Sequence, residues 1–509
     1  MLKKMKREKL PKEKKPKKKH VMGSGEFIFN FISLVFMLGV ALYFGGRSLY
    51  YYSKQNVKIK EEAMTVNGLI VQNSNLAKEN NEDGLHQDLD GYYFKGKVEN
   101  NYVMFENRLF RVIRVNNDDT VKMISEGFAT SFMWGESSNY KDSNVQNWLN
   151  KTEQEHSGIY YDTIINNKLL KKTEYTEDIL KDGKIISLEE FNKEKEEELE
   201  KEKKLEEESN KEENIEEVKE EEKKTTKKEE TEKVEVKKEK DYVTILTIKD
   251  YTLANGMSSY LNNGKMFYLL GLNEDEENLY VEEDGSIQST DSLSGYGIRP
   301  VITLKKNTEV VSGSGTKDDP YVVKGSEKNY VDSYVKLGED TWKVSSIEND
   351  TLKLYLNGYL KENGNEVTRN YSSYNSIYNI WDWSNIGSYL NNNYVNSLSY
   401  KDKLVDCNFY IGEISDDAGY RFNNIYNRNV NAKVGLLNIF DYVGNSDLSD
   451  YFHINQTSEV GSMEYNIYSN GLLEEADVRD VKHIVPVVCI KKDSIKNGEG
   501  SINNPYKVE

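Results

Sequence analysis

Three tryptophans lie in polar surroundings where an indole ring could stack on the face of a sugar. Trp134 lies in SFMWGES, and Trp381 and Trp383 lie in NIWDWSN. Large aromatic side chains with one polar edge occur both in cores and at binding surfaces. We therefore consider Trp134, Trp381 and Trp383 as ligand-binding candidates, with core packing as the favoured alternative. Trp148 and Tyr389 fall on the apolar face of short predicted helices and are expected in the core.

Acidic residues and histidines give little indication of catalysis. Asp250 and Asp441 each precede a tyrosine at the predicted end of a strand, where an aspartate usually caps the next helix or turn; ligand binding is the alternative. The five histidines do not recur at matching positions, and HExxH, GxSxG and Cys/His zinc spacings do not occur. Glycosidase carboxylates cannot be singled out among 86 acidic residues. Residues 79–90 match an EF-hand loop only in part, since a strand is expected to follow them. The sequence predicts no catalytic residue, no metal site and no cofactor.

Both cysteines of the chain, Cys407 and Cys489, lie in its C-terminal part. Disulfides persist in oxidising compartments outside the cytosol. A disulfide between Cys407 and Cys489 is therefore one interpretation, and two free thiols are the other.

The same short pattern occurs twice, as GSGTKDDPYVV at 313–323 and GEGSINNPYKV at 498–508. The glycines are expected to adopt positive φ in a turn, and the prolines are expected to begin the last strand. We assign a structural role to these repeated positions: Gly313, Gly315, Pro320, Tyr321, Gly498, Gly500, Pro505 and Tyr506.

Four further blocks recur in the same order before these two endings. In one of them Asp250 and Tyr260 fall on Asp441 and Tyr451 without a gap. Blocks that recur in one order predict a tandem duplication. The first copy is longer by 47 residues, which a stretch rich in Glu and Lys at 193–240 explains; the whole charged insertion is placed at about 174–241. The paired blocks are 102–123 with 334–354, 143–150 with 384–391, 245–261 with 436–452, and 294–304 with 478–490.

The blocks also predict the elements of each copy. Residues 102–123 alternate apolar and polar side chains around turn formers, which predicts a three-stranded meander with one buried face. Residues 143–150 predict a short amphipathic helix behind Ser143, and residues 243–251 predict a strand followed by a second short helix. The fold class is therefore α+β, with two tandem, mostly antiparallel domains and short helices. The charged insertion keeps no heptad register, so we expect a solvated helix or a disordered loop.

An uncharged run, FIFNFISLVFMLGVALYF at 27–44, predicts a transmembrane helix, because about 20 helical residues span the core of a bilayer. Residues 1–20 carry eleven Lys or Arg and two Glu, whereas the remainder has a net charge near −27. Basic residues beside a membrane helix predict a cytoplasmic N-terminus and place the rest of the chain outside. A cleaved signal peptide and a pilin-type leader fit this run less well. The acidic exterior argues against nucleic acid as a partner.

The first copy contains GYYFKGKVENNYVMF, SNVQNWLN, ILTIKDY, GYGIRPVITL and GSGTKDDPYVV. These segments resemble the bacterial domain family DUF6273, whose members occur on anchored surface proteins. The second copy has diverged further, with KHIVPVVCI in place of Gly and Arg before the proline, and with His483 near the position of Gly297. The family in turn is similar to the C-type-lectin-like fold shared with sulfatase-modifying proteins. The resemblance implies a binding scaffold more readily than an enzyme.

Together these features predict an organisation and a function. Residues 1–25 form a basic cytoplasmic tail, 26–46 the transmembrane helix and 47–90 a stalk, and two DUF6273-like domains occupy 91–324 and 325–509. The predicted function is ligand recognition or scaffolding at the bacterial cell envelope without catalysis. The expected partners are the lipid bilayer, contacted by the apolar run, and an envelope glycan or a surface protein. A wall-active or carbohydrate-modifying hydrolase is the first alternative, and a purely structural envelope component is the second.

Overall fold

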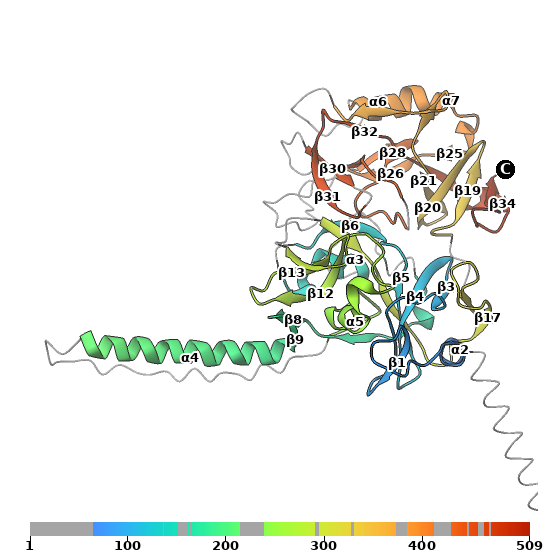
Figure 1. The fold of residues 1–509 in the computed structure, drawn as a ribbon. Helices are drawn as coiled ribbons and strands as arrows, with labels where there is room; N and C mark the ends of the chain where they lie inside the picture. The colour runs from blue at the N-terminus through green and yellow to red at the C-terminus, as the bar shows by residue number, and fades with distance from the viewer. Residues whose placement is uncertain are drawn as a thin grey trace, which may run out of the picture. The chain divides into compact units, whose positions relative to one another are not determined.

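Most of the regular elements in the described chain are strands and a few are helices, so the fold is mixed α+β, as predicted (Figure 1). The predicted span at 27–44, together with Trp381 and Trp383, lies outside the described residues. Within the described part of the chain, no helix combines the length and the apolar character needed to cross a bilayer. We call residues 65–326 the first half and 330–508 the second half. The computed structural model describes residues 65–135, 137–150, 161, 165–213, 239–290, 295–326, 330–372, 384–411, 429–444, 447–456, 463–467 and 470–508.

One sheet of the first half is built around the predicted meander. Strands β3 (Tyr102–Phe105), β4 (Arg108–Asn116) and β5 (Val121–Ser125) pair antiparallel in chain order. Strand β16 (Val301–Leu304) extends the sheet beside β5, and β18 (Tyr321–Val323) pairs parallel with β3. Apolar side chains of these strands are buried in the main core, which stabilises the sheet by removing them from water.

A sheet of the second half has the same strand order. Strands β19 (Tyr334–Leu337), β20 (Asp340–Glu348) and β21 (Thr351–Leu356) form a second antiparallel meander. Strand β33 (Pro486–Lys491) lies beside β21, and β35 (Tyr506–Val508) pairs parallel with β19. Each strand of this sheet therefore has a counterpart in the first half.

Twelve further strands, from both halves, join into one sheet. In the first half β12 (Phe267–Asn273) pairs parallel with β15 (Gly295–Ile298), through Phe267 and Gly297. In the second half β29 (Tyr451–Gln456) pairs parallel with β32 (Val481–His483), through Tyr451 and His483. The two sets meet where β15 pairs with β31, and this sheet also contains β6 (Thr130–Met133), β8 (Asp178–Lys181), β9 (Lys184–Ser187), β13 (Asn278–Val281), β14 (Ile287–Thr290), β24 (Thr368–Asn370), β30 (Met463–Ile467) and β31 (Leu473–Asp477).

The first predicted short helix is present in both halves and makes matching bonds. Helix α3 (Asn144–Asn150) begins behind Ser143, whose Oγ accepts from the amide of Gln146 at 3.0 Å. Helix α6 (Asn385–Tyr389) is capped in the same way by Ser384, which accepts from Gly387 at 2.8 Å. A serine at this position satisfies an amide that the helix itself leaves unpaired. The sequence prediction of both caps is confirmed.

The segment at 243–251 differs from its prediction. Strand β11 is only Val243–Thr244, and helix α5 (Ile248–Leu253) begins earlier because Thr247 caps it and accepts from the amide of Asp250. Asp250 therefore lies in the first helical turn and is not the cap. The match of Tyr260 with Tyr451 is also wrong, because Tyr451 begins β29, whereas Tyr260 lies in the turn before β12.

The second part of the predicted stalk belongs to the folded body. Helix α2 (Val66–Asn73) buries Val66 and Ile70, and the amide of Val66 donates to the carbonyl of Thr308. Strand β1 (Gly84–Asp88) pairs with β2 (Gly91–Lys95), so residues 79–90 form no calcium loop. The apolar residues around Ile70 explain this difference, because they are buried against the first half instead of remaining in solvent.

The charged insertion contains a long helix, α4 (Leu188–Glu213), which follows the β8–β9 hairpin (Figure 1). Phe191, in its first turns, packs with Ile179 and Leu272 in a small separate core. The sequence left a helix and a disordered loop open, and residues 188–213 adopt the helix. Residues 214–238 lie outside the described part of the chain.

The remaining short elements connect these sheets and helices. They are η1 (Tyr140–Asp142), η3 (Asn167–Leu169), β7 (Thr173–Tyr175), β10 (Glu239–Asp241), η4 (Gly256–Ser258), β17 (Val310–Ser312), β22 (Lys361–Glu362), β23 (Asn365–Glu366), η6 (Leu390–Tyr394), α7 (Val395–Ser397), η7 (Lys401–Lys403), β25 (Leu404–Val405), β26 (Cys407–Tyr410), β27 (Asn429–Ala432), β28 (Val434–Leu436), η10 (Lys492–Ser494) and β34 (Ile495–Asn497).

Candidate functional site

Arg111, in the middle of β4, is held rigidly by two tyrosines and three hydrogen bonds. Its guanidinium lies 3.9 Å from the ring centre of Tyr102 and 4.8 Å from that of Tyr260. The Nε donates to Asn101 Oδ1 at 2.6 Å, Nη1 donates to the Tyr102 hydroxyl at 2.8 Å, and Nη2 donates to the Val98 carbonyl. Two aromatic faces and three acceptors fix the orientation of this cation, which is the condition for specific anion recognition.

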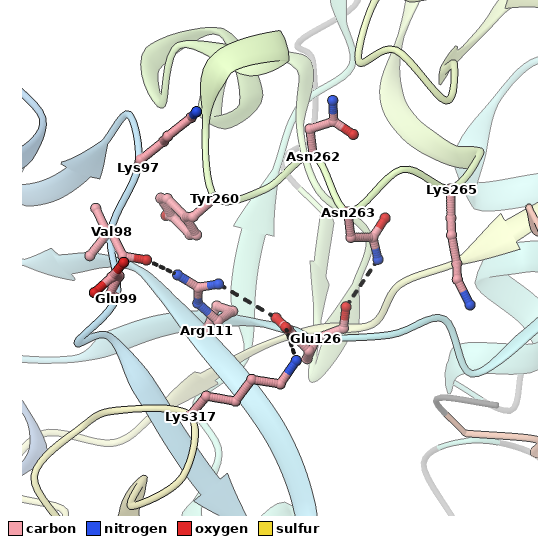
Figure 2. Close-up of a pocket in the computed structure, with 10 residues that line it drawn as sticks. All are labelled: Lys97, Val98, Glu99, Arg111, Glu126, Tyr260, Asn262, Asn263, Lys265 and Lys317. Carbon is pink, nitrogen blue, oxygen red and sulfur yellow. Dashed lines mark hydrogen bonds and ion pairs between the residues drawn. The ribbon is translucent and has the colours of Figure 1, made fainter. Parts of the chain in front are cut away.

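Arg111 lies at the base of a pocket of about 450 Å³ in the first half. Figure 2 shows its guanidinium between the Val98 carbonyl and Glu126, next to the ring of Tyr260. The lining contains four basic side chains and two carboxylates, so the pocket is locally cationic in an otherwise acidic protein. We call it the arginine pocket, and it is lined by Lys97, Val98, Glu99, Arg111, Glu126, Tyr260, Asn262, Asn263, Lys265 and Lys317.

Glu126 is the carboxylate closest to Arg111. One of its oxygens lies 3.7 Å from Nη1 of Arg111, and the other lies 3.5 Å from Nζ of Lys317 and accepts from the Tyr102 hydroxyl at 3.3 Å. A third cation, Arg299, is buried behind the pocket and donates to the carbonyls of Ser125 and Leu261. Burial lowers the pKa of Arg299 to about 10; Glu126 opposes this shift and the like charge of Arg111 adds to it. The cations around Glu126 therefore outnumber the carboxylates that face them.

The arginine pocket offers a ligand charged and amide groups. Its two carboxylates lie among lysines and an arginine, and none of its lining residues is a serine, a cysteine or a histidine. Within the described residues, no three His, Cys, Asp or Glu side chains are grouped to hold a metal ion.

A second pocket, of about 540 Å³, contains Asp250 in its wall. Its main cations are already neutralised within the protein. Arg114 donates to both oxygens of Asp88 at 2.7 Å, Lys122 pairs with Asp250, and Lys171 pairs with Asp118. We therefore regard it as the weaker candidate for a ligand.

Asp250 and Asp441 occupy the same position in the two halves, as the repeat predicted. Asp250 pairs with Lys122 of β5, and Asp441 pairs with Lys353 of β21. Asp441 is 1% exposed, so it cannot touch a ligand. Because the same ion pair is fully buried in the second half, its main role in both halves is structural, and the interpretation of these aspartates as ligand-binding residues is wrong for Asp441.

Trp134 is also not a binding residue. The indole is 1% exposed and lies against the rings of Tyr140 and Tyr268, with centroid distances of 5.9 and 5.1 Å. The backbone carbonyl of Trp134 accepts from the amide of Asn144, the first residue of α3. In the second half the backbone carbonyl of Tyr371 accepts from the amide of Asn385, the first residue of α6. Core packing, the interpretation that the sequence analysis favoured for Trp134, is therefore confirmed. Trp381 and Trp383 lie outside the described residues, so their role stays a prediction.

The repeated glycines have the conformation that the sequence predicted. The φ angles are +104° and +87° at Gly313 and Gly315, and +102° and +78° at Gly498 and Gly500. A Cβ on Gly313 or Gly498 would collide with the carbonyl of the following proline, Pro320 or Pro505. A Cβ on Gly315 or Gly500 would collide with the ring of Tyr321 or Tyr506, both of which are buried.

Cys407 and Cys489 form a disulfide between β26 and β33, with their Cα atoms 5.5 Å apart. In the first half Thr303 pairs with Lys122 in the sheet, just as Cys489 pairs with Lys353. The Thr303 hydroxyl accepts from Thr173 at 2.7 Å, so a hydrogen bond replaces the covalent link there. Thr173 therefore takes the position of Cys407 in the first half.

Comparison with known proteins adds no further assignment. No family model, no curated protein and no solved structure matches this chain. The resemblance to DUF6273 and to the C-type-lectin-like fold therefore stays a prediction, and function is argued from the site alone.

Sequence reasoning missed Arg111, Glu126 and Lys317. One signal was available, because β4 carries three arginines in RLFRVIRVN, a strand that is otherwise apolar. A buried strand tolerates a cation only where aromatic faces, acceptors or a counter-charge compensate it. Glu126 and Lys317 had no comparable signal, since each is one acidic or basic residue among many.

Proposed function

We propose that this chain is a membrane-anchored, extracytoplasmic protein of the bacterial cell envelope that recognises a ligand without catalysis. The observation that carries this proposal is the arginine pocket, in which Arg111 is held between Tyr102 and Tyr260 under a cationic rim. A rigid cation in an open polar pocket gives orientation and specificity to a bound ligand. The ligand is an envelope glycan or a surface protein, and nucleic acid is disfavoured by the charge of −18.

The two halves are proposed to be copies of one DUF6273-like domain, with boundaries near 91–324 and 325–509. Matching bonds at matching positions support this duplication. Asn150 and Asn391 each exchange two hydrogen bonds with the backbone of Val243 and Val434, respectively. Independent domains would not be expected to repeat such side-chain bonds in the same order. A C-type-lectin-like fold remains part of this proposal.

The extracytoplasmic location rests on two observations. The Cys407–Cys489 disulfide suits an oxidising compartment. The basic residues 1–20 before the apolar run at 27–44 favour a cytoplasmic N-terminus. Protease added to intact cells should therefore remove an epitope placed at the C-terminus, and complete protection of that epitope would contradict this topology.

The experiment that tests recognition is cosedimentation of the purified full-length protein with purified envelope material, followed by analysis of the supernatant. Saturable binding without released fragments is the expected result. Released fragments would favour the hydrolase alternative, in which carboxylates act on the envelope polymer. Absence of any interaction would favour the purely structural component, with α4 as a spacer or a docking element.

A further inference from the structure

The residue that corresponds to Arg111 in the second half is Lys343. Arg111 pairs with Tyr102 across β3 and β4, and Lys343 pairs with Tyr334 across β19 and β20. Each cation also lies over the ring of its tyrosine, at 3.9 Å for Arg111 and 5.5 Å for Lys343. The two halves therefore place a cation on an aromatic face at the same point of the sheet.

In the second half this cation is neutralised by the protein itself. The ammonium of Lys343 forms an ion pair with the carboxylate of Asp332, and both side chains are largely buried. Burial opposes the charged form of Lys343, but Asp332, with Tyr442 and Tyr334, outweighs it and raises the pKa. A Cβ on Gly444 would touch both charged groups, so the backbone closes over the pair. In the second half a carboxylate of the protein itself therefore occupies the position beside the cation.

In the first half the corresponding carboxylate is missing. The amide of Val112 donates to the carbonyl of Asn101, and the amide of Val344 donates to the carbonyl of Ser333. Asn101 therefore corresponds to Ser333, and the preceding residue, Asn100, corresponds to Asp332. Asn100 carries no charge and donates to the carbonyl of Asn73 at 3.2 Å. Three of the five N–H groups of Arg111 donate hydrogen bonds within the protein, and Nη1 also lies 3.7 Å from Glu126, which leaves one N–H group on Nη2.

The charges around this position do not balance. Glu126 is the carboxylate beside Arg111, but it also forms an ion pair with Lys317 and lies near the buried Arg299. In the second half Val485 stands at the place of Arg299, and Asp332 lies near both Lys343 and the buried Arg108. In the first half Arg111, Lys317 and Arg299 lie around Glu126, and the pocket lining holds four basic side chains against two carboxylates. An arrangement of this kind stabilises a bound anion, because the anion restores the charge balance in a partly desolvated site.

We propose that the arginine pocket binds a carboxylate group of a small acidic ligand, in the position that the Asp332 carboxylate takes beside Lys343. This inference deepens the proposed function and rests on it. A single carboxylate fits better than a phosphate dianion, since Glu99 and Glu126 also line the pocket and repel a second negative charge. The carboxylate can belong to an acidic sugar or to the end of a peptide, and both present the same planar group to Arg111.

The test is isothermal titration calorimetry of the full-length protein with matched acid and neutral probes. Glucuronic acid is compared with glucose, and N-acetylalanine with N-acetylalaninamide, while inorganic phosphate serves as a third anion. We expect at least one acid to bind about tenfold or more tightly than its neutral partner, because a charge-assisted bond is lost in the neutral probe. Which acid binds identifies the source of the carboxylate.

Two variants connect this binding to the pocket. Asn100→Asp introduces the carboxylate of the second half and leaves the contacts of Arg111 in place, so we expect it to weaken the acid at least tenfold. It also loses the exposed hydrogen bond to the Asn73 carbonyl, so a small decrease in Tm is expected. Lys317→Ala should weaken the acid several-fold, whereas the matched exposed lysine variant Lys324→Ala should not. Circular dichroism and Tm of each variant show whether the fold is retained.

Three results would overturn this inference. Equal affinity for an acid and its neutral partner would show that no carboxylate is recognised, and tighter binding of phosphate than of either acid would assign another anion. No saturation by either acid well above a millimolar would also reject it. If the wild type still cosediments with envelope material in that case, the proposed function stands and only the ligand class is wrong.

Discussion

The ammonium of Lys353 lies 2.8 Å from both carboxylate oxygens of Asp441, and both side chains are buried. The same pair recurs in the first half as Lys122 and Asp250. The carboxylate of Asp441 also accepts from the amide of Asn438 at 2.9 Å, so it holds the chain after β28 against β21. The pair therefore ties one turn to the meander of each half.

Replacing Asp441 by Asn should destabilise the protein by about 3–5 kcal/mol, because it leaves the buried Lys353 without its counter-charge. The free energy of unfolding in urea measures this loss. Glu309→Gln is a matched control, since Glu309 pairs with Lys324 where the side chains are 48% and 61% exposed, and it should cost less than about 1 kcal/mol. Similar losses for both variants would contradict the structural role of the buried pair.

The double variant Lys353→Met with Asp441→Leu separates charge from packing. Removal of both charges leaves no uncompensated ion, so the double variant should be more stable than Asp441→Asn alone. If the double variant loses as much free energy of unfolding as Lys353→Met and Asp441→Leu lose in total, the two residues act independently.

Stability at acid pH should depend on Asp250. Burial raises its pKa, but the ammonium of Lys122 and the hydroxyl of Thr247 outweigh burial, so the pKa in the folded state lies below the usual 3.8. A lowered pKa contributes stability that is complete above about pH 4 and is lost as the pH falls through the folded value. The difference in unfolding free energy between wild type and Asp250→Asn should therefore be large near neutral pH and shrink below about pH 4. A difference that is constant across this range would contradict the assignment.

Gly313→Ala should lower the free energy of unfolding much more than Gly183→Ala. Both glycines have positive φ, +104° and +72°, but a Cβ on Gly183 meets no atom within 4 Å, whereas one on Gly313 meets the Pro320 carbonyl. Strain alone should cost about 1–2 kcal/mol at Gly183, and the collision should add about 1–3 kcal/mol at Gly313. Thermal unfolding of both variants checks this order. Equal losses would show that the backbone relieves the collision.

The disulfide should stabilise the protein in oxidising conditions. Cys407 and Cys489 are 82 residues apart, so the bond closes a long loop in the unfolded chain. Replacing both cysteines by alanine should lower the unfolding free energy by about 2–4 kcal/mol. A reducing agent should lower the stability of the wild type but not that of the variant. An equal response of both proteins would contradict this role of the bond.

The sequence predicted local structure well where a pattern has a direct physical cause. The alternation of apolar and polar residues predicted the meanders. Ser143, with Ser384 at the matching position, predicted where the helices begin, and the repeated glycines predicted the positive φ angles. It failed where long-range packing decides. Residues 66–73 were assigned to a stalk, yet α2 buries Val66 and Ile70 against the first half. Core packing of Trp134, which the sequence analysis favoured, is confirmed.

The arginine pocket could not be predicted from the sequence because its members come from distant segments. Arg111 lies on β4, Tyr260 precedes β12 and Lys317 lies in the repeated glycine turn. The repeat, however, makes the pocket interpretable. The comparison of Arg111 with Lys343 depends on a register that the sequence blocks at 102–123 and 334–354 had already indicated.

The most direct test of the account is the affinity of the full-length protein for purified envelope material, measured by cosedimentation for wild type, Lys317→Ala and Lys324→Ala. Both lysines are exposed to a similar extent, at 60% and 61%, but only Lys317 lines the arginine pocket. The account predicts saturable binding that Lys317→Ala weakens several-fold and Lys324→Ala leaves unchanged. Equal affinity of all three proteins would contradict recognition through this pocket.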